Sequence, residues 1–352
     1  MAYTTIKKPS DYFNTVLYTG NNSSPRTITG VGFQPDMNWS KIRSEANDHW
    51  ISDAVRGANK IIRPNTTDVE LVDGSSGYLS SFNSDGYVIA AGSGTNDNFN
   101  KNSGTYASWN WKAGGGAGSS NTDGSITSTV SVNTTSGFSI VSYTGTGSNG
   151  TVGHGLGVTP KVIITKARTN SGRFWGMYHA SKGNTGSQPL NDTQAFDVSS
   201  TYWQDTNPTS SVFSVGINGD TNSSSGMIAY CFAEKTGYSK FGSYIGNASA
   251  DGPFVYTGFK PAFVIAKLTS VAGENWYMWD NKRSTGNVMD KFLYPNLGNA
   301  EVGSSSFVDF LSNGFKLRSS SDVLNGSGNT HIYMAFAEAP LVGTNGVTAK
   351  AR

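Results

Sequence analysis

Two glutamates occupy matching places in the sequence and are the first residues to consider for chemistry. Glu234 and Glu338 each follow a short apolar run that is typical of a β-strand. A pair of carboxylates can serve as the acid and the base or nucleophile of glycoside hydrolysis. A third run of the same kind has Ala113 at the matching place, so the pattern is incomplete. A glycan-cleaving enzyme is therefore kept only as a remote alternative.

Asp53 and Asp280 form a second matching pair, each a few residues after a tryptophan. The corresponding stretch between them in the sequence offers only Tyr178 and His179. No single unit of the chain thus contains a complete nucleophile, acid–base pair or metal set. We expect no catalytic residue and a protein that is not an enzyme.

Other motifs that could hold a cofactor or a metal ion are also incomplete. Residues 145–150 read G-x-G-x-x-G, but further glycines follow where dinucleotide binding needs a helix, so we expect a hairpin tip. Asn96, Asp97 and Asn98 offer oxygens to calcium, although a polar turn is the better interpretation. The single cysteine, Cys231, lies in an apolar run. The histidines lack ligand spacing; they are His49, His154, His179 and His331. We expect no cofactor, metal site or disulfide.

The elements that would position these residues occur three times in the chain. A lysine follows a proline by six residues, a tryptophan follows it by fifteen, and a tyrosine precedes it by seventeen. The three sets are Tyr18, Pro35, Lys41 and Trp50; Tyr143, Pro160, Lys166 and Trp175; and Tyr244, Pro261, Lys267 and Trp276. Such spacing indicates an internal repeat of about 100 residues.

Each repeat is predicted to contain a central β-hairpin. The proline begins an apolar, β-branched run, as in residues 161–166 and 262–267, because it suits the start of a strand. The tryptophan opens the second strand, so it is interpreted as core packing, with ligand stacking as the alternative. Polar tips lie between the strands, at residues 44–48, 169–172 and 270–273. These tips are the candidate recognition surfaces, because loops on a fixed scaffold commonly carry binding.

The predicted fold class is all-β, with three tandem antiparallel β-sandwich repeats of jelly-roll-like form; a barrel is the alternative. The expected order is an N-terminal arm at 1–9, repeats at 10–113, 137–236 and 237–342, a Gly/Ser/Thr-rich linker at 114–136, and a C-terminal tail at 343–352. The linker is expected to be at least partly flexible, although 126–132 could form a strand. We expect the second and third repeats to pack together and the first to be more independent.

Basic residues also recur in the repeat, and two interpretations of them stay open. Lys41, Lys166 and Lys267 end the first hairpin strand, and Arg56, Lys182 and Arg283 follow the second strand. These side chains either lie over the tryptophan or pair with the nearby aspartates. Alternatively, they form a solvated outer face of the sheet.

The overall composition narrows the class of partner. The chain has 26 basic and 24 acidic residues, a net charge of +2, and no basic stripe, so nucleic-acid binding is not expected. No stretch resembles a signal peptide or is long enough for a membrane span. We therefore expect a protein made in a cytoplasm that does not insert into membranes.

The unit Gly32-Phe33-Gln34-Pro35, followed by Lys41, Arg43, Trp50, Asp53 and Arg56-Gly57, resembles a repeat of virion proteins of tailed phages, notably marine ones. These proteins are described as tail-fibre-like or structural. The second repeat departs from the pattern, with Val158 for phenylalanine and no matching aspartate. The resemblance implies a non-enzymatic component of a phage particle, located on the virion.

Three functions are compatible with these sequence features. The first is a tail-fibre or tail-associated protein that binds a host surface glycan or protein, and the second is a decoration protein of the capsid or tail without a host ligand. The third is the glycan-cleaving enzyme. In the first two cases we expect contacts with other virion proteins and a homo-oligomer on the particle. The arm residues Lys7, Lys8 and Pro9 are expected to provide the virion attachment.

Overall fold

The computed structural model describes residues 4–94, 97–304 and 307–341. Their regular structure consists of antiparallel β-sheets, with only the single helical turns η1 (Pro9–Asp11), α1 (Gly219–Asn222) and α2 (Asp322–Asn325) besides. Short apolar runs separated by glycine-rich and polar turns favour this outcome over helices. The predicted all-β class is confirmed.

The first repeat pairs one large sheet with one small sheet. The large sheet has the order β1-β9-β3-β4-β5-β6, and the small sheet has the order β2-β8-β7. The strands are β1 (Phe13–Thr19), β2 (Arg26–Thr29), β3 (Met37–Ile42), β4 (Trp50–Asp53), β5 (Gly57–Ile62), β6 (Leu71–Val72), β7 (Tyr78–Asn83), β8 (Gly86–Ala90) and β9 (Thr105–Trp111).

The second repeat has a large sheet with the order β10-β11-β12-β19-β14-β15 and two small sheets, β13-β18 and β16-β17. The strands are β10 (Ser119–Asn121), β11 (Ser128–Asn133), β12 (Phe138–Thr144), β13 (Gly150–Gly153), β14 (Val162–Ala167), β15 (Gly176–His179), β16 (Gly186–Ser187), β17 (Asp197–Val198), β18 (Val212–Val215) and β19 (Gly226–Phe232).

The segment predicted as a linker is part of the second large sheet. Within residues 114–136, β10 pairs with β11, and β11 pairs with β12 along six residues. The chain entering this segment is held by Asp36, whose carboxylate accepts hydrogen bonds from the backbone N–H groups of Ala113, Gly115 and Gly116. A flexible linker is therefore wrong here, because backbone pairing outweighs the turn-forming composition, and the strand considered within 126–132 is β11.

The third repeat has a large sheet with the order β20-β26-β22-β23 and a small sheet with the order β21-β25-β24. The strands are β20 (Ser239–Ile245), β21 (Phe254–Tyr256), β22 (Phe259–Leu268), β23 (Trp276–Asp280), β24 (Val308–Leu311), β25 (Gly314–Leu317) and β26 (Thr330–Pro340). All three large sheets share one four-strand order, namely β1-β9-β3-β4, β12-β19-β14-β15 and β20-β26-β22-β23.

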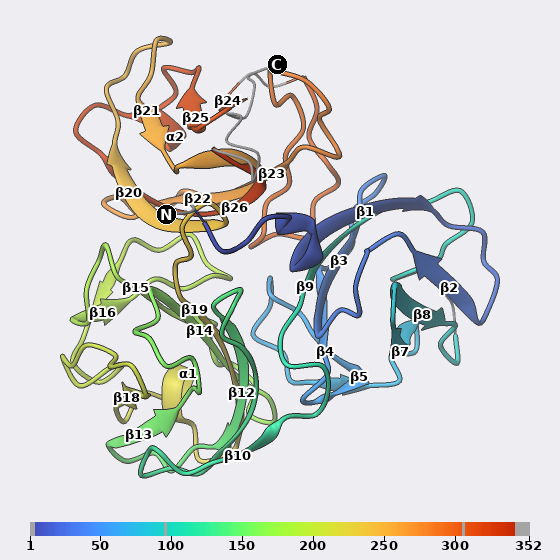
Figure 1. Ribbon diagram of the computed structural model, residues 1–352, viewed down its shortest axis with the longest axis vertical. Helices are drawn as coiled ribbons and strands as arrows, with labels where there is room; N and C mark the ends of the chain where they lie inside the picture. Colours follow the sequence, from blue (N-terminus) through green and yellow to red (C-terminus); the bar gives the residue numbers. More distant parts are fainter. Residues whose placement is uncertain (1–3, 95–96, 305–306, 342–352) are drawn as a thin grey trace.

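Each large sheet buries both of its faces. One face packs with the small sheets into a core of its own repeat. The other face turns toward the middle of the molecule, where side chains of all three repeats form one cluster, which we call the central core. Figure 1 shows the three lobes arranged around this common centre. The expectation that the first repeat is more independent is wrong, because Phe13, Trp39 and Trp109 belong to the central core.

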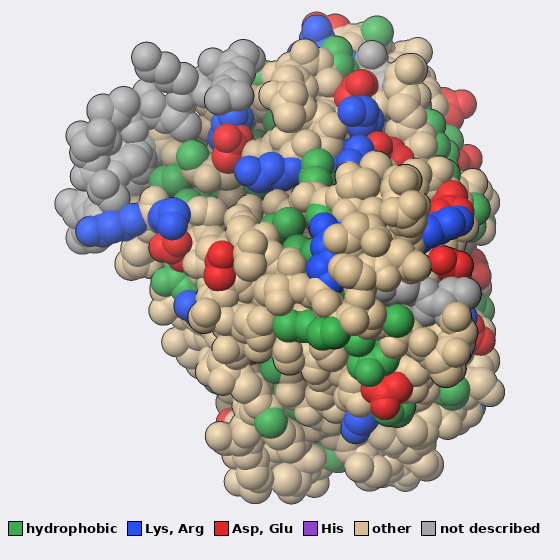
Figure 2. All heavy atoms as spheres, turned by 90° about the vertical axis from the view of Figure 1, so that its right-hand side faces the viewer, with side chains coloured by type: hydrophobic (Ala, Val, Ile, Leu, Met, Phe, Trp, Pro, Cys, Tyr) green, Lys and Arg blue, Asp and Glu red, His purple; other side chains and the backbone are tan. Residues whose placement is uncertain are grey.

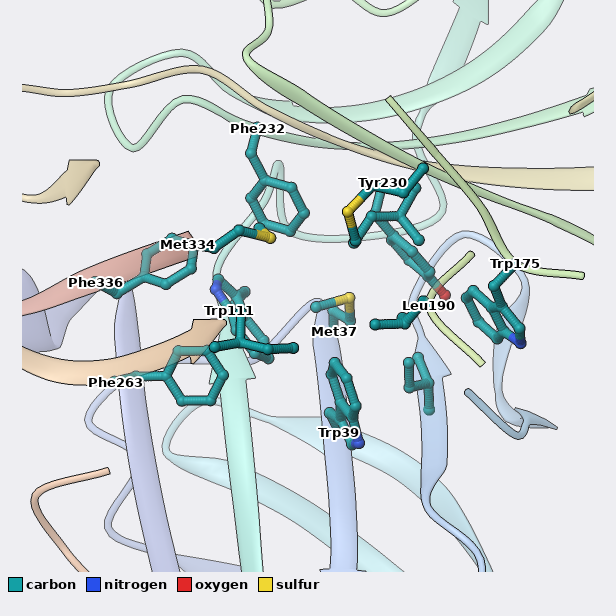
Figure 3. A pocket seen from close by; sticks show the side chains of 14 residues that line it. Met37, Trp39, Trp111, Trp175, Leu190, Tyr230, Phe232, Phe263, Met334 and Phe336 are labelled. Carbon is teal, nitrogen blue, oxygen red and sulfur yellow. The ribbon is translucent and has the colours of Figure 1, made fainter. Parts of the chain in front are cut away.

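The middle of the central core contains a small cavity of about 30 Å³ (Figure 3). Side chains from every repeat line it, including Trp39, Phe232 and Met334. The lining is apolar, and an apolar cavity of this size is expected to stay dry. The cavity is therefore a packing gap at the point where three sheets converge, and it does not provide a polar ligand site.

The three repeated tryptophans are all buried, but they do not occupy equivalent positions. Trp175 and Trp276 belong to the central core, whereas Trp50 belongs to the core of the first repeat. The reason is the register of the hairpin: Trp39 pairs with Ile51, while Ile265, at the same offset from its proline, pairs with Met278. The first hairpin is one residue shorter, and a one-residue shift moves a side chain to the opposite face.

Replacing Trp175 by alanine should lower the free energy of unfolding by about 3 to 5 kcal/mol, because a large aromatic side chain leaves the central core. Denaturant unfolding measures this loss. The matched control is Val198→Ala, since Val198 is 71% exposed and its truncation should change the stability by less than about 0.5 kcal/mol. A loss below about 1 kcal/mol for Trp175→Ala would contradict the assignment to a tightly packed centre.

Candidate functional site

His49 takes the structural place of the two central tryptophans. The backbone N–H of His49 donates to Asn65 Oδ1, and the N–H groups of Trp175 and Trp276 donate in the same way to Asn191 and Asn296. Trp39 Nε1 donates to His49 Nδ1 at 2.9 Å, so Nε2 of the neutral ring carries the proton. Burial holds the pKa of His49 well below its usual value, which keeps the ring neutral.

An equivalent side-chain hydrogen bond joins each repeat to a neighbouring repeat, and the three bonds together form a closed ring. Trp175 Nε1 donates to Arg63 O at 2.9 Å, and Trp276 Nε1 donates to Pro189 O at 2.9 Å. His49 Nε2 donates to Tyr294 O at 3.1 Å. We call the three contacts marked by these bonds the first–second, second–third and third–first seams, after the repeats that they join.

Two of the seams carry a carboxylate shared between arginines of neighbouring repeats. Glu70 contacts Arg56 of its own repeat at 3.0 Å and Arg168 of the second repeat at 2.9 Å. Glu301 repeats this arrangement at the third–first seam with Arg283 at 3.2 Å and Arg43 at 2.7 Å. Burial raises the pKa of Glu70, but the hydrogen bonds and charges of both arginines outweigh it and hold this pKa below its usual value.

The second–third seam has the same backbone contact without the ion bridge. Phe196 N donates to Thr269 O at 3.0 Å, as Glu70 N does to Arg168 O and Glu301 N does to Arg43 O. Here Phe196 replaces the glutamate and Thr269 replaces the arginine. Lys182 Nζ lies 4.8 Å from the centre of the Phe196 ring, a cation–π contact. The three seams therefore share a geometry but differ in charge.

The aspartates after the hairpin are structural partners of these arginines. Asp53 and Arg56 approach to 2.5 Å, as do Asp280 and Arg283, and all four side chains are fully buried. The predicted pairing of arginine with aspartate is confirmed, and the solvated outer face is wrong for these residues. An arginine over an indole is also present, since the Arg283 guanidinium lies 5.4 Å from the Trp109 ring.

The three repeated lysines are buried as well. Each ammonium group donates to a backbone carbonyl: Lys41 to Ile42 O at 2.5 Å, Lys166 to Arg173 O at 2.6 Å, and Lys267 to Leu268 O at 2.6 Å. Burial lowers the pKa of each lysine to about 8, although nearby carboxylates oppose the shift. A solvated role for these lysines is wrong, because the strand end at which they lie faces a neighbouring repeat.

The glutamates considered for catalysis do not share a site. Glu234 lines a cavity of about 340 Å³ and contacts Lys240 at 3.1 Å, whereas Glu338 lines another cavity of about 200 Å³ and contacts Lys260 at 2.7 Å. Each carboxylate is thus paired with a cation of its own surroundings. The geometry offers no acid–base pair built from these two groups.

The other motifs are placed in structural roles. Residues 145–149 connect β12 to β13 as a loop and Gly150 begins β13, so the helix that dinucleotide binding requires does not follow this motif. Cys231 is a buried free thiol, and burial raises its pKa. Within the described residues, no three His, Cys, Asp or Glu side chains come together to hold a metal ion. Asn96 and part of its turn lie outside the described residues.

The histidines other than His49 lie in three separate places. His154 Nε2 is 3.3 Å from Thr209 O, and His179 Nε2 is 3.2 Å from Tyr333 O across the second–third seam. The ring of His331 stacks on Tyr244 with 4.7 Å between centroids. These contacts account for the rings as packing and hydrogen-bonding groups.

An exposed aromatic pair was not singled out by the sequence pattern. Phe254 (44% exposed) and Tyr256 (54% exposed) project from the same face of β21, with buried Val255 between them. Tyr256 also borders the 340 Å³ cavity, together with Glu234 and Lys240. The cavity is completed by Thr236, Gly237, Ser239, Thr257 and Gly258. This combination of aromatic surface, hydroxyls and charges is the candidate binding surface.

The aromatic pair is a feature of the third repeat alone among corresponding strands. Ile28 of β2 and Val152 of β13 are the buried counterparts of Val255, each within the core of its own repeat. The residues flanking Ile28 are Thr27 and Thr29. The residues flanking Val152 are Thr151 and Gly153. Comparing these alternating strands is the signal that could have identified Phe254 and Tyr256 from the sequence.

A family model for a domain of unknown function, DUF7483, matches residues 8–340. The chain belongs to the DUF7483 family. The match spans all three repeats, in agreement with a central core that needs each of them. No curated protein and no solved structure matches the chain.

The hairpin tips of this DUF7483 protein form contacts between neighbouring repeats. Their backbone N–H groups donate to the neighbouring repeat, and the pairs are Asn47 to Gly298 O at 2.7 Å, Gly172 to Thr67 O at 3.1 Å, and Gly273 to Thr193 O at 2.9 Å. Parts of each tip remain exposed. Recognition at the tips thus has to operate from loops that are already held in place.

The N-terminal arm belongs to the folded core where the structure describes it. Ile6 is buried in the central core, and Thr4 Oγ1 donates to Thr236 O at 2.5 Å. Pro9 is buried at the start of η1, while Lys7 and Lys8 are exposed. The arm therefore contributes to the folded body, because Ile6 packs within the central core.

The surface adds two observations about partners. The face in Figure 2 carries basic and acidic side chains side by side, without an expanse of one sign. In the described part of the chain, no helix has the length and apolarity to span a bilayer.

The buried lysines should give the stability of this protein a rise with pH. Below about pH 8, Lys267 is protonated in both states, whereas between pH 8 and about 10.4 the unfolded chain binds more protons. The contribution of Lys267 to the free energy of unfolding should therefore increase across this window. Lys267→Met should reduce that increase, by up to about 1.4 kcal/mol for each pH unit of the pKa difference.

Urea unfolding at intervals from pH 7.5 to pH 10 measures this effect. The control variant is Val198→Ala, whose pH profile should run parallel to that of the parent protein. Identical slopes for the parent and Lys267→Met would show that the ammonium group of Lys267 is not desolvated.

Proposed function

We propose that this DUF7483 protein is a non-enzymatic component of a tailed-phage particle that is exposed on the virion and binds the host surface, as a tail-fibre-like or tail-associated protein. The resemblance of the unit from Gly32 to Gly57 to repeats of phage virion proteins supports the phage origin. The proposed partners are other virion proteins and a host surface glycan or protein. A homo-oligomer on the particle is part of the same proposal.

The way the ionisable groups are used supports binding over catalysis. Asp53, Asp280, Glu70 and Glu301 are held by arginines, and the repeated lysines are held by carbonyl groups. Charged groups fixed in this way stabilise contacts between repeats, and they are not free to exchange protons with a substrate.

The observation that carries the proposal is the exposed pair Phe254 and Tyr256 beside the 340 Å³ cavity. Exposed aromatic side chains with nearby hydrogen-bonding groups are suited to recognition, because rigid rings give contact area at a low cost in conformational entropy. The corresponding strand of the first repeat, β2, carries Thr27 and Thr29 at these positions. The fold of the repeat therefore does not require Phe254 and Tyr256 to be aromatic.

Tyr256→Ala should weaken binding of the purified protein to intact host cells by about tenfold or more, because the exposed ring contributes its contact area directly. Fluorescently labelled protein and competition with phage adsorption measure this effect. Val198→Ala is the matched control, since it removes an exposed apolar side chain from another strand.

Two results would contradict host binding. Protein that binds purified particles but not host cells, together with normal adsorption of phage lacking it, would identify a decoration protein. Cleavage of host polysaccharide that is lost in Glu234→Gln would identify a glycan-cleaving enzyme.

The exposed arm residues Lys7 and Lys8 are proposed as a contact with the particle. Deleting the arm would also remove Ile6 from the central core, so substitution is the cleaner experiment. The double variant Lys7→Ala and Lys8→Ala should melt like the parent but be reduced severalfold in purified particles, as measured by immunoblotting. Undiminished incorporation would assign attachment to another surface.

A further inference from the structure

One side of the second repeat is closed by the segment that precedes its opening strand. Strand β11 pairs with the outer edge of β12 along six residues. Just before β11, the backbone N–H of Ile126 donates to Thr151 O of β13 at 2.9 Å. Ile126 and Val130 are buried in the core of this repeat. The segment therefore fills the space between β12 of the large sheet and β13 of the small sheet.

The third repeat has no described strand at the corresponding place. Its opening strand β20 is an edge strand of the large sheet, and β21 is an edge strand of the small sheet. The 340 Å³ cavity lies between them, because Ser239 and Lys240 of β20 and Tyr256 of β21 line it. We call this region the open side of the third repeat. Edges of this kind are templates for the addition of a further strand.

The loop after β21 shows what the second repeat has in place of the cavity. A Cβ atom at Gly155, in the corresponding loop after β13, would lie 3.2 Å from Val130 Cγ1 and 3.5 Å from Val132 Cγ1. Two valines of β11 therefore pack on that loop. In the third repeat the loop contains Thr257 and Gly258, and both line the cavity. The cavity thus lies where the second repeat places apolar side chains of an added strand.

The backbone of β20 directs hydrogen-bonding groups toward the open side. Phe241 N donates to Glu234 Oε1 at 2.9 Å, so this N–H points away from the neighbouring strand β26. The N–H groups of Ser243 and Ile245 point the same way, because alternate residues of a strand direct these groups to the same side. Ser243 and Ile245 are exposed. This part of the edge is therefore accessible to another strand.

The first repeat closes its corresponding side by a side-chain bond. Asn14 Nδ2 donates to Val31 O at 3.0 Å, which joins β1 to the loop after β2. Asn14 is the second residue of β1, and the second residue of β20 is Lys240. Lys240 pairs with Glu234 instead. The third repeat is thus the one that its described residues leave open at this place.

The described part of the chain ends at the rim of this cavity. Leu341 N donates to Gly258 O at 3.3 Å, and Gly258 lines the cavity. Residues 342–352 come next and lie outside the described residues. An extended chain advances by about 3.3 Å per residue, so residues 342–346 alone reach up to about 17 Å from Leu341. The segment is therefore long enough to enter the open side.

The sequence of this C-terminal segment suits an added strand. Apolar and polar residues alternate in the order Val347, Thr348, Ala349, Lys350, Ala351 and Arg352. Such alternation is typical of a strand with one buried face. Strand β11 has the same length and also alternates, with Ser131 between Val130 and Val132. Gly343 and Gly346 precede the alternating residues and favour a flexible connection to Leu341.

We propose that residues 347–352 dock as a strand on the open side of the third repeat, in the role that β11 has in the second. The backbone of this strand bonds to the edge of β20, and Val347 enters the cavity. Thr348 and Lys350 face the solvent, since neighbouring residues of a strand point to opposite sides. The occupant is the chain's own C-terminal segment.

This inference does not depend on the proposed function. A strand added at the edge of the small sheet lies beside β21, whereas Phe254 and Tyr256 project from its outer face. Host binding through these rings is therefore compatible with a docked segment. Cell binding and docking are measured separately, so the failure of one leaves the other standing.

Hydrogen–deuterium exchange followed by NMR tests the docking by comparing the full chain with a variant that ends at Leu341. Truncation should speed the exchange of the Ser243 and Ile245 amides at least tenfold, because their hydrogen bonds to the added strand are lost. The amides of β12 are the internal control, since β11 covers that edge in both proteins. Equal exchange of Ser243 and Ile245 in the two proteins would overturn the proposal.

A matched pair of substitutions tests which side of the segment faces the cavity. Val347→Asp should speed the exchange of the same two amides as truncation does, because it places a charge in the cavity. Thr348→Asp should leave the rates of the parent, since this side chain faces the solvent. Parent-like exchange in Val347→Asp would refute the proposed strand.

Protein concentration distinguishes the chain's own segment from that of a second copy. Protection of Ser243 and Ile245 should stay constant when the concentration is varied by about a hundredfold, because docking within one chain does not depend on it. Protection that is lost on dilution would overturn the proposal and assign the open side to a strand exchanged between two copies.

Discussion

The structure depends on burying three apolar sheet faces against one another. Each large sheet has one face covered by the small sheets of its own repeat, and its second face is covered only when the other two repeats are present. A repeat whose apolar face lacks its neighbours would expose Trp39, Trp175 or Trp276 to water, at a cost that grows with the apolar area. The three repeats therefore form one cooperative body, and the family match over 8–340 corresponds to this body.

The seams show how one geometry tolerates different chemistry. Glu70 and Glu301 each bridge two arginines, and removing one partner would leave buried charges uncompensated. At the second–third seam, Phe196 replaces the glutamate and Thr269 replaces an arginine, so apolar packing covers the same contact. Lys182 still carries a positive charge at this seam, and its ammonium group contacts the Phe196 ring in place of a carboxylate. The backbone hydrogen bond is common to all three seams, and it preserves the alignment while the side chains differ.

The sequence was sufficient to predict the all-β fold class and most of the hairpin strands in each repeat. Alternating short runs and turn residues predicted strands, and the fixed offsets of Pro35, Lys41 and Trp50 marked the hairpins. The offsets did not predict the position of Trp50, which packs in the core of its own repeat. The first hairpin is one residue shorter, and a shift of one residue turns a side chain to the other face of the sheet, although its spacing from the proline is unchanged. Lys41 was ambiguous because alternation does not tell an outer face from a face that another repeat covers. Glu70 and Glu301 were missed because their partners lie in another repeat, and Phe196 interrupts the pattern.

The placement of Phe13 and Phe336 in one aromatic stack has a consequence for synthesis. Their ring centroids are 5.2 Å apart, although Phe13 opens the first strand and Phe336 lies in the last. A ribosome produces the first repeat long before the strand that covers its apolar inner face. The growing chain must keep that face exposed until translation is nearly complete, a period in which a partly made sheet is open to aggregation. The rate of synthesis, and not only the final packing, thus bears on the yield of folded protein.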